Sequence, residues 1–292
     1  MALGDKISAL MSSMRGNANG VASLDDNAKI PIEQMPNAFG ELGGRVDVLE
    51  DYHTEGYQAD ENDPGGYIGM KIEGGGTIFF DYKIGYGYGS LTVPPITANL
   101  HTYHVDPTRN IVVCDDPNDT SKVNRFYVVS DYDIGDYVHG ECLSWASTDL
   151  TTMYNVSLGT STAFGQGYSN TEKCITAATN GGAVEWNALA YKNIWHYLWK
   201  GDWQSRNPKW FLPSKDEINV LLNMQWQDSA RRKSYDGNTT LKQLPINFYA
   251  YYWSSSESSA TVAHVAHFYL GTINTYNKNY TRNYHARLVK TF

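Results

Sequence analysis

Two His-x-x-His pairs are the residues of this sequence whose type and spacing come closest to a metal site. They are His264 with His267, in the run TVAHVAHFYLG, and His101 with His104. Residues three apart on a strand point to opposite faces of the sheet. We therefore expect ordinary surface or core histidines and no metal ion shared within either pair.

An aspartate-rich loop and a glycine-rich loop imitate two other binding motifs. Asp131, Asp133 and Asp136 in DYDIGD follow the start of a calcium loop, but Gly135 comes one place early and the distal acidic ligand is missing. The alternating glycines of residues 85–89 imitate a phosphate loop without its GK[ST] sequence or a following helix, so we expect tight β-turns. The sequence predicts no cofactor and no metal ligand.

No pattern typical of an activated nucleophile accompanies these residues. The three cysteines, Cys114, Cys142 and Cys174, are odd in number and widely spaced, which predicts reduced, structural thiols. A Ser-His-Asp triad is recognised by geometry rather than by listing residues, but no G-x-S-x-G elbow supports one. We expect a binding protein and not an enzyme.

The composition favours recognition over catalysis or nucleic-acid binding. Aromatic residues make up 13% of the 292 residues, with 22 tyrosines, while charged residues make up only 18%. Tyrosine with small polar residues is typical of recognition surfaces. The net charge of −8, without Lys and Arg clusters, argues against nucleic acid as the partner. Neither an apolar run of about 18 residues nor a signal-peptide pattern is present, so we expect no membrane insertion and no export through a signal peptide.

The N-terminal part reads as an attachment segment followed by a short helix. We expect residues 1–38 to attach the chain to a virion or fibre. Within them, residues 16–36 are rich in Gly, Asn, Asp and Pro, which indicates turns and extended chain. Within residues 39–57, four apolar side chains share one helical stripe: Phe39, Leu42, Val46 and Leu49. The stripe fits either a short coiled-coil seam or an ordinary amphipathic helix.

Two further regions follow. Residues 58–137 alternate β-branched and aromatic runs with Gly, Pro, Asn and Asp, which predicts a β-rich spacer domain. The sequence leaves open whether this region is a domain of its own or part of the edge of the next one. In residues 138–292 we expect a helix within residues 181–201 and a second helix that starts at a capping box of Ser214 and Glu217. Strand-like runs complete an α+β fold class, with two helices and antiparallel strands.

Two stretches resemble known families. ANGVASLD and KIP, within residues 18–31, resemble a motif near the N-termini of bacteriophage tail-fibre proteins. The ordered blocks WFLPSKDEINVLL, YYWSSSE, Phe-x-x-Gly and ARLVKTF resemble the C-type lectin fold of diversity-generating retroelement variable proteins. The second resemblance covers residues 138–292 and implies a variable region at about residues 246–292.

That resemblance implies a ligand-binding surface rewritten by a reverse transcriptase that makes errors at template adenines. Asn codons changed at their adenines give Tyr, Ser, Thr, His and Asp, which crowd the C-terminal segment. The expected ligand-binding residues are Asn247, Tyr249, Tyr251, Ser258, Ser259, Thr261, His264, Tyr269, Asn274, Tyr276, Asn277, Asn279, Tyr280, Thr281, Asn283 and Tyr284. A β-domain that is simply rich in Asn and Tyr is the alternative.

Large apolar residues of the same segment are expected to form a fixed scaffold. Five fit inward-facing positions, where burial of each contributes about 1.5–3 kcal/mol. They are Trp253, Phe268, Ile273, Val289 and Phe292. Arg287 matches the family's C-terminal arginine, and we expect it to form a structural ion pair with Glu257.

Other chemistry known for the lectin fold is not expected. Its formylglycine-generating enzymes use a late cysteine pair, and no cysteine follows Cys174. The Glu-Pro-Asn, Gln-Pro-Asp and Trp-Asn-Asp motifs of calcium-dependent sugar binding are also missing.

These resemblances imply a phage-type receptor-binding protein located on the virion or at the extracellular surface. The expected partners are a host cell-surface protein or glycan, other virion or tail proteins through the N-terminus, and further copies of the chain in a homotrimer. The main alternative is a non-diversified bacterial surface protein that binds carbohydrate. An enzyme of unknown class on the same scaffold is a third hypothesis.

Overall fold

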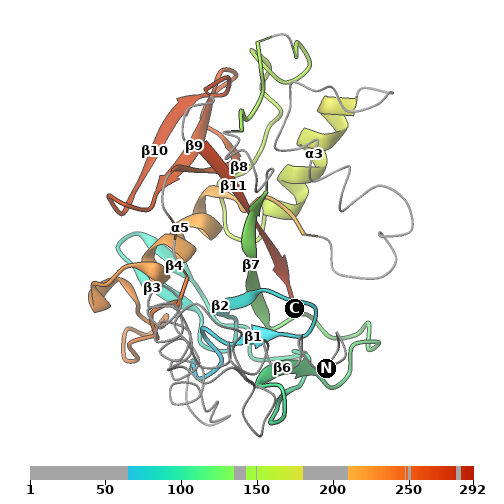
Figure 1. Cartoon of the computed structure of the whole chain (residues 1–292), viewed down its shortest axis with the longest axis vertical. Helices are drawn as coiled ribbons and strands as arrows, with labels where there is room; N and C mark the ends of the chain where they lie inside the picture. Colours follow the sequence, from blue (N-terminus) through green and yellow to red (C-terminus); the bar gives the residue numbers. More distant parts are fainter. Residues whose placement is uncertain are drawn as a thin grey trace, which may run out of the picture. The chain divides into compact units, whose positions relative to one another are not determined.

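A computed structural model of the chain describes residues 65–134, 143–148, 150–179, 210–246, 248, 251–280 and 284–292 (Figure 1). All of them belong to one compact unit that spans Ala59–Phe292. The predictions for residues 1–57 and for the helix within residues 181–201 lie outside the described residues.

Nine strands form one sheet in the order β10-β9-β8-β11-β7-β2-β1-β6-β5. β8 pairs with β11 and β1 with β6 in parallel, and the other neighbouring strands pair antiparallel. Together with the two α-helices of the described residues, this largely antiparallel sheet confirms the predicted α+β class. The elements of the sheet are β1 (Lys71–Ile72), β2 (Thr77–Asp81), β5 (Tyr103–Asp106), β6 (Ile111–Cys114), β7 (Phe126–Ile134), β8 (Tyr251–Glu257), β9 (Val262–His267), β10 (Thr272–Asn277) and β11 (Tyr284–Thr291).

The sheet runs across the boundary predicted between residues 137 and 138. β7 pairs with β2 on one side and with β11 on the other, so strands from both predicted regions share one ladder (Figure 1). The sequence left two possibilities open for residues 58–137. The pairing of β7 places β1, β2, β5 and β6 of this region in the same sheet as the C-terminal strands, while β3 and β4 form a separate hairpin.

The helix α5 (Lys215–Gln225) starts as the sequence predicts. The Ser214 side chain accepts the N–H of Glu217, and the Glu217 side chain accepts the N–H of Ser214, which completes the capping box. Ile218, Leu221 and Leu222 are buried, as expected from their spacing. A one-turn 3-10 helix, η4 (Ser229–Arg231), follows.

The helix α3 (Gly167–Thr179) was not predicted from the sequence. Its run GYSNTEKCITAAT has no acidic residue in the first turn and no basic residue in the last turn. Burial of Thr171, Cys174, Ile175 and Ala178 shows that a mixed polar and apolar face packs inward. The sequence pattern of a helix is weak here because packing, not propensity, selects it.

The glycine-rich loop forms a hairpin, as predicted. β3 (Tyr86–Tyr88) pairs antiparallel with β4 (Leu91–Val93). Gly85 and Gly89 flank β3 with φ angles of 62° and 60°, a left-handed conformation that favours glycine. Gly85 and Gly89 therefore allow the chain to turn at both ends of β3.

Three of the five predicted scaffold residues are buried in the core. Trp253, Phe268 and Val289 are at most 2% exposed, whereas Ile273 and Phe292 are half-buried.

Glu217 joins the starts of the two helices. Its carboxylate accepts the N–H groups of Ser214 at 2.6 Å, Gly165 at 3.0 Å and Gly167 at 3.3 Å. Gly167 lies so close to this carboxylate and to Phe211 that a Cβ atom would clash. Complete burial of Glu217 disfavours its charged form and raises its pKa from 4.5 to about 7, despite the three backbone donors.

The raised pKa of Glu217 predicts a pH dependence of folding. The folded chain holds this proton at pH values where the unfolded chain releases it, so the contribution is full below about pH 4.5 and is lost as pH rises to about 7. The loss amounts to about 3 kcal/mol at most. We expect the free energy of unfolding of the wild type, relative to Glu217→Gln, to fall across this window in urea denaturation at a series of pH values. A difference that is constant with pH would contradict the assignment.

Candidate functional site

Four of the predicted ligand-binding residues form a compact aromatic group, here called the tyrosine cluster: Tyr251, Tyr276, Tyr280 and Tyr284. Tyr251 lies 5.8 Å from Tyr276 and 5.1 Å from Tyr284 between ring centroids. Tyr276 lies 6.2 Å from Tyr280 and 5.4 Å from Tyr284. Ring separations of about 4.5–7 Å are those at which aromatic side chains attract one another. The cluster is a preformed surface of several rings.

Strand register explains why residues far apart in sequence meet in the cluster. Tyr251 pairs with His267 across β8 and β9, and with Tyr284 across β8 and β11, so these side chains share one face of the sheet. Tyr276 pairs with Ala263 on β9, two strand periods from His267 on the same face. The small side chain of Ala263 leaves room for the tyrosine rings to approach one another above β9.

His267 supports the cluster from within the sheet. Its ring stacks on Tyr251 at 4.0 Å with an interplanar angle of 2°. The side chain is buried, its Nδ1 atom has no hydrogen-bond partner, and burial lowers the pKa of the imidazole. The ring is therefore a neutral stacking partner near pH 7. Burial also lowers the pKa of His264, three residues earlier; Lys215 at the start of α5 lowers it further, and Asp216 opposes the shift.

Exposure differs strongly among the predicted ligand-binding residues. Tyr269 is 78% exposed and Tyr280 is 48% exposed, whereas Tyr284 is only 4% exposed and stacks on Trp253 at 4.9 Å. Tyr251 and Tyr276 lie between these extremes. Tyr284 thus forms the floor of the cluster, and Tyr280 presents its open side to solvent.

Four further predicted residues lie at the two ends of β9. Ser258, Ser259 and Thr261 form the turn before this strand, and Tyr269 lies in the turn after it. A strand of 6 residues is about 20 Å long, so these two groups are not neighbours. Asn277 and Asn279 are exposed at the end of β10, and Asn274 is half-buried within it. The positions of Asn247, Tyr249, Thr281 and Asn283 lie outside the described residues.

A buried ion pair that the sequence did not predict lies beneath this region. Lys278 donates to Glu257 at 2.6 Å and to the carbonyl oxygens of Met153 and Val156, each at 3.1 Å. Its ammonium group also lies 4.5 Å from the ring centroid of Trp145. Burial lowers the pKa of Lys278, while Glu257 opposes that shift. A lone lysine in a polar stretch gave no sign of this burial.

The expected ion pair between Arg287 and Glu257 is wrong. Arg287 pairs with Asp133 at 2.5 Å, because β11 and β7 place these residues directly opposite each other. The second oxygen of Glu257 accepts the N–H of Leu158 at 2.9 Å. Arg287 and Glu257 therefore bind different partners.

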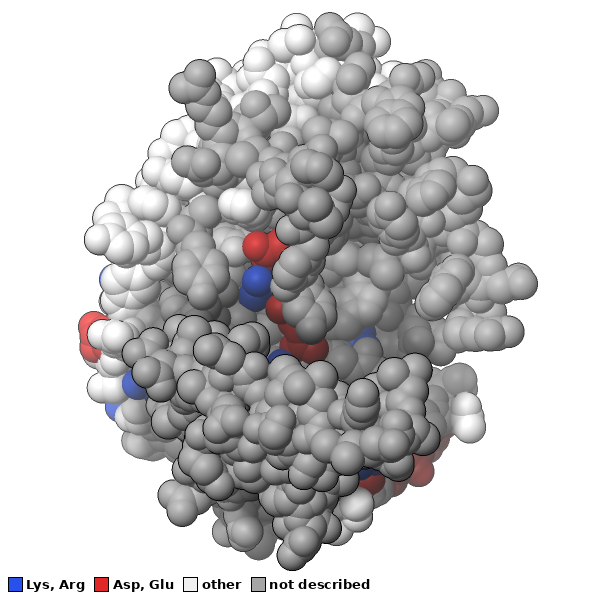
Figure 2. All heavy atoms as spheres, viewed as in Figure 1, with Lys and Arg blue, Asp and Glu red and all other residues white. Residues whose placement is uncertain are grey.

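The aspartates of the DYDIGD sequence also have structural partners. Asp131 pairs with Lys71, and Asp133 accepts the Tyr252 hydroxyl at 3.0 Å as well as Arg287. Figure 2 shows Lys and Arg residues adjacent to Asp and Glu residues on the face that it views. Asp136 lies outside the described residues.

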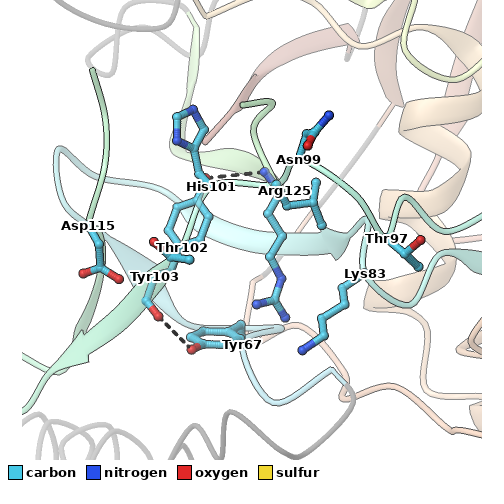
Figure 3. A pocket seen from close by; sticks show the side chains of 10 residues that line it. Tyr67, Lys83, Thr97, Asn99, His101, Thr102, Tyr103, Asp115 and Arg125 are labelled. Carbon is cyan, nitrogen blue, oxygen red and sulfur yellow. Dashed lines mark hydrogen bonds between the residues drawn. The ribbon is translucent and has the colours of Figure 1, made fainter. Parts of the chain in front are cut away.

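A cavity of about 560 Å³ is lined by residues between Tyr67 and Arg125, near β5. Lys83 and Arg125 reach toward Tyr67 across it, while the His101 ring points the other way (Figure 3). Arg125 donates two hydrogen bonds to Asp81, at 2.8 and 2.7 Å. Its Cζ atom lies 4.9 Å from the ring centroid of Tyr67. The cavity offers an ammonium group and aromatic walls to a polar molecule. No sequence pattern indicated it, since its walls come from segments that are far apart in the sequence.

Comparisons with known proteins give the chain no relative. It matches no protein-family model, and comparison with curated proteins and with solved structures finds no significant match. Within the described residues, the helices are too short or too polar to cross a membrane.

Removal of the Lys278 ammonium is predicted to destabilise the fold strongly. Lys278→Met leaves the Glu257 carboxylate buried without its cation, which costs about 3–5 kcal/mol. Replacing both partners, with Glu257→Gln and Lys278→Met together, is expected to recover much of that loss. Urea denaturation measures both effects.

Lys71→Met is the matched control, because Lys71 forms a pair with Asp131 whose side chains are 38% and 28% exposed. We expect a cost below about 1 kcal/mol there. Equal costs for Lys71→Met and Lys278→Met would show that the buried pair carries no special stability.

Proposed function

We propose that this chain is a phage-type receptor-binding protein whose C-terminal region displays a diversified ligand-binding surface. The observation that carries the proposal is the tyrosine cluster, in which strand register holds Tyr251, Tyr276 and Tyr284 together. Exposed asparagines lie at the end of β10 and just after it. Tyrosine supplies broad, rigid contact area, and asparagine and serine supply adaptable hydrogen bonds. The proposed activity is binding of a host cell-surface protein or glycan, without turnover.

A C-type lectin fold is part of the same proposal. Three of the sequence blocks behind the resemblance have clear structural roles: WFLPSKDE supplies the cap of α5, YYWSSSE forms β8, and ARLVKTF spans most of β11 and the C-terminus. The glycine of the fourth block, Gly271, has a φ of 65°, and a Cβ there would clash with Arg231 and Trp226. Each block thus contributes to the scaffold.

Diversification by a retroelement is part of the proposal, and the distribution of residue types supports it. The exposed positions Asn277, Asn279 and Tyr280 carry residues reachable from Asn codons by changes at adenine, whereas buried Trp253 does not. A binding surface can change in this way while the core is retained. In the proposal, residues 1–38 attach the chain to a virion or fibre.

Trimerisation completes the proposed mode of action. Several copies of one surface on a particle raise the overall avidity by about 10²–10⁴ when they engage together. A modest affinity at each tyrosine cluster is then sufficient for attachment to a host cell.

Sequencing of the gene in its natural population tests the proposal directly. We expect substitutions at codons such as those of Asn277, Asn279 and Tyr280, confined to adenines of a nearby near-identical template copy, with Trp253 and Phe268 unchanged. An invariant segment without such a copy would remove the retroelement and leave the non-diversified carbohydrate-binding surface protein as the better hypothesis.

Stability measurements test the separation of scaffold from display. We expect Tyr269→Ala, Asn277→Ala and Tyr280→Ala each to change the free energy of unfolding by no more than about 0.5 kcal/mol. Trp253→Ala, which creates a core cavity, is expected to cost about 3–5 kcal/mol. Thermal and urea denaturation distinguish these outcomes, and large losses at the exposed positions would contradict their role as replaceable contacts.

A further inference from the structure

The hairpin of β5 and β6 brings together three side chains with different metal-binding atoms. Tyr103 pairs with Cys114, and beyond this pair the N–H of Asp115 donates to the carbonyl of Thr102 at 2.9 Å. The ladder thus continues past the strands and places His101 opposite Asp116. The sequence had grouped His101 with His104, but His104 contacts Asp115 instead.

The three donor atoms converge on one point. His101 Nδ1 lies 3.0 Å from Asp116 Oδ1, and Cys114 Sγ lies 3.7 Å from the same oxygen. All three atoms lie within 4.8 Å of one another. His101 is 9% exposed, and the Cys114 and Asp116 side chains are half-buried, so the donors are held in place by their surroundings.

We propose that His101, Cys114 and Asp116 form a binding site for a divalent cation that accepts sulfur and nitrogen ligands, with Zn²⁺ as the best fit. Zinc bond lengths of about 2.0–2.3 Å at tetrahedral angles separate nitrogen from oxygen by about 3.4 Å and sulfur from oxygen by about 3.6 Å. The observed separations of 3.0 and 3.7 Å differ from these by a few tenths of an ångström. Tetrahedral zinc also requires about 3.6 Å between sulfur and nitrogen, so the Cys114 and His101 donor atoms, which lie within 4.8 Å of each other, would move together on binding.

The donor set selects among metals. Calcium and magnesium take oxygen ligands almost exclusively, so a thiolate and an imidazole disfavour both. Thiolate and imidazole together favour zinc and other late transition metals. Three protein ligands leave one tetrahedral position for water or for an atom of a bound molecule.

Local charge is compatible with a divalent ion. Lys122 pairs with the other oxygen of Asp116, so Oδ1 remains directed at His101 and Cys114. The carboxylates of Asp115 and Asp116 with a Cys114 thiolate carry as much negative charge as Zn²⁺ and Lys122 carry positive charge. The N–H of Thr102 donates to Asp116 Oδ1 at 3.1 Å and orients this ligand from the backbone.

Titration of the full-length, reduced chain with Co²⁺ and Zn²⁺ tests the site. We expect one Co²⁺ per chain, with a thiolate-to-cobalt charge-transfer band that Zn²⁺ abolishes by displacement. Zn²⁺ is also expected to raise the melting temperature, since a ligand of the folded state stabilises it. Absence of the thiolate band with an excess of Co²⁺ would overturn the proposal.

Substitutions identify the ligands. Cys114→Ser and His101→Gln are each expected to weaken Zn²⁺ binding by about tenfold or more, because even groups that only orient metal ligands contribute about 10–100-fold. Cys174→Ala, which removes a buried cysteine of α3, is the control and is expected to keep the band and the affinity. Circular dichroism and melting without metal confirm that each variant is folded. Binding that is unchanged in folded Cys114→Ser would refute the assignment, and neither result bears on the proposed receptor binding.

Discussion

The buried ion pair of Lys278 and Glu257 is the interaction on which the C-terminal part of the structure depends. Lys278 follows β10 and Glu257 ends β8, so the pair joins two strands that are not neighbours in the sheet. Lys278 also binds the carbonyl oxygens of Met153 and Val156, and Glu257 binds the N–H of Leu158. Because both charges are removed from water, neither is stable there without all of these partners. The pair therefore fixes the loop before α3 against the sheet.

This constraint explains how a surface made of polar and aromatic residues can be rigid. The tyrosine cluster has only one deeply buried member, Tyr284, which stacks on buried Trp253. Trp253 in turn donates to the carbonyl of Leu143, and Trp145 donates to that of Ser254, so two indoles cross-link the loop and β8. The exposed rings rest on a framework that buried groups hold together. Such a separation between support and contact is what a binding surface that varies in sequence requires.

At the other edge of the sheet, around β5 and β6, contacts between distant segments also hold polar side chains in place. There the ends of the β5 and β6 hairpin hold a histidine, a thiol and a carboxylate within reach of one another, and Arg125 is fixed by Asp81 beside a cavity. β7 connects the halves, because it pairs with β2 and with β11. Groups on both halves thus belong to one sheet, although they lie in regions that differ in composition.

The sequence by itself determined the local features: the capping box at Ser214, the glycine turns beside β3, the α+β class and the inward positions of Trp253 and Phe268. Each depends on residues adjacent in the chain or on a simple period of two or 3.6. The tertiary structure alone decided the partners of charged groups, since Arg287 meets Asp133 and Glu257 meets Lys278 through pairing of distant strands. It also decided which tyrosines meet, and it placed Cys114 and Asp116 beside His101. Strand register sets these contacts, and register is a property of the whole sheet that no single segment encodes.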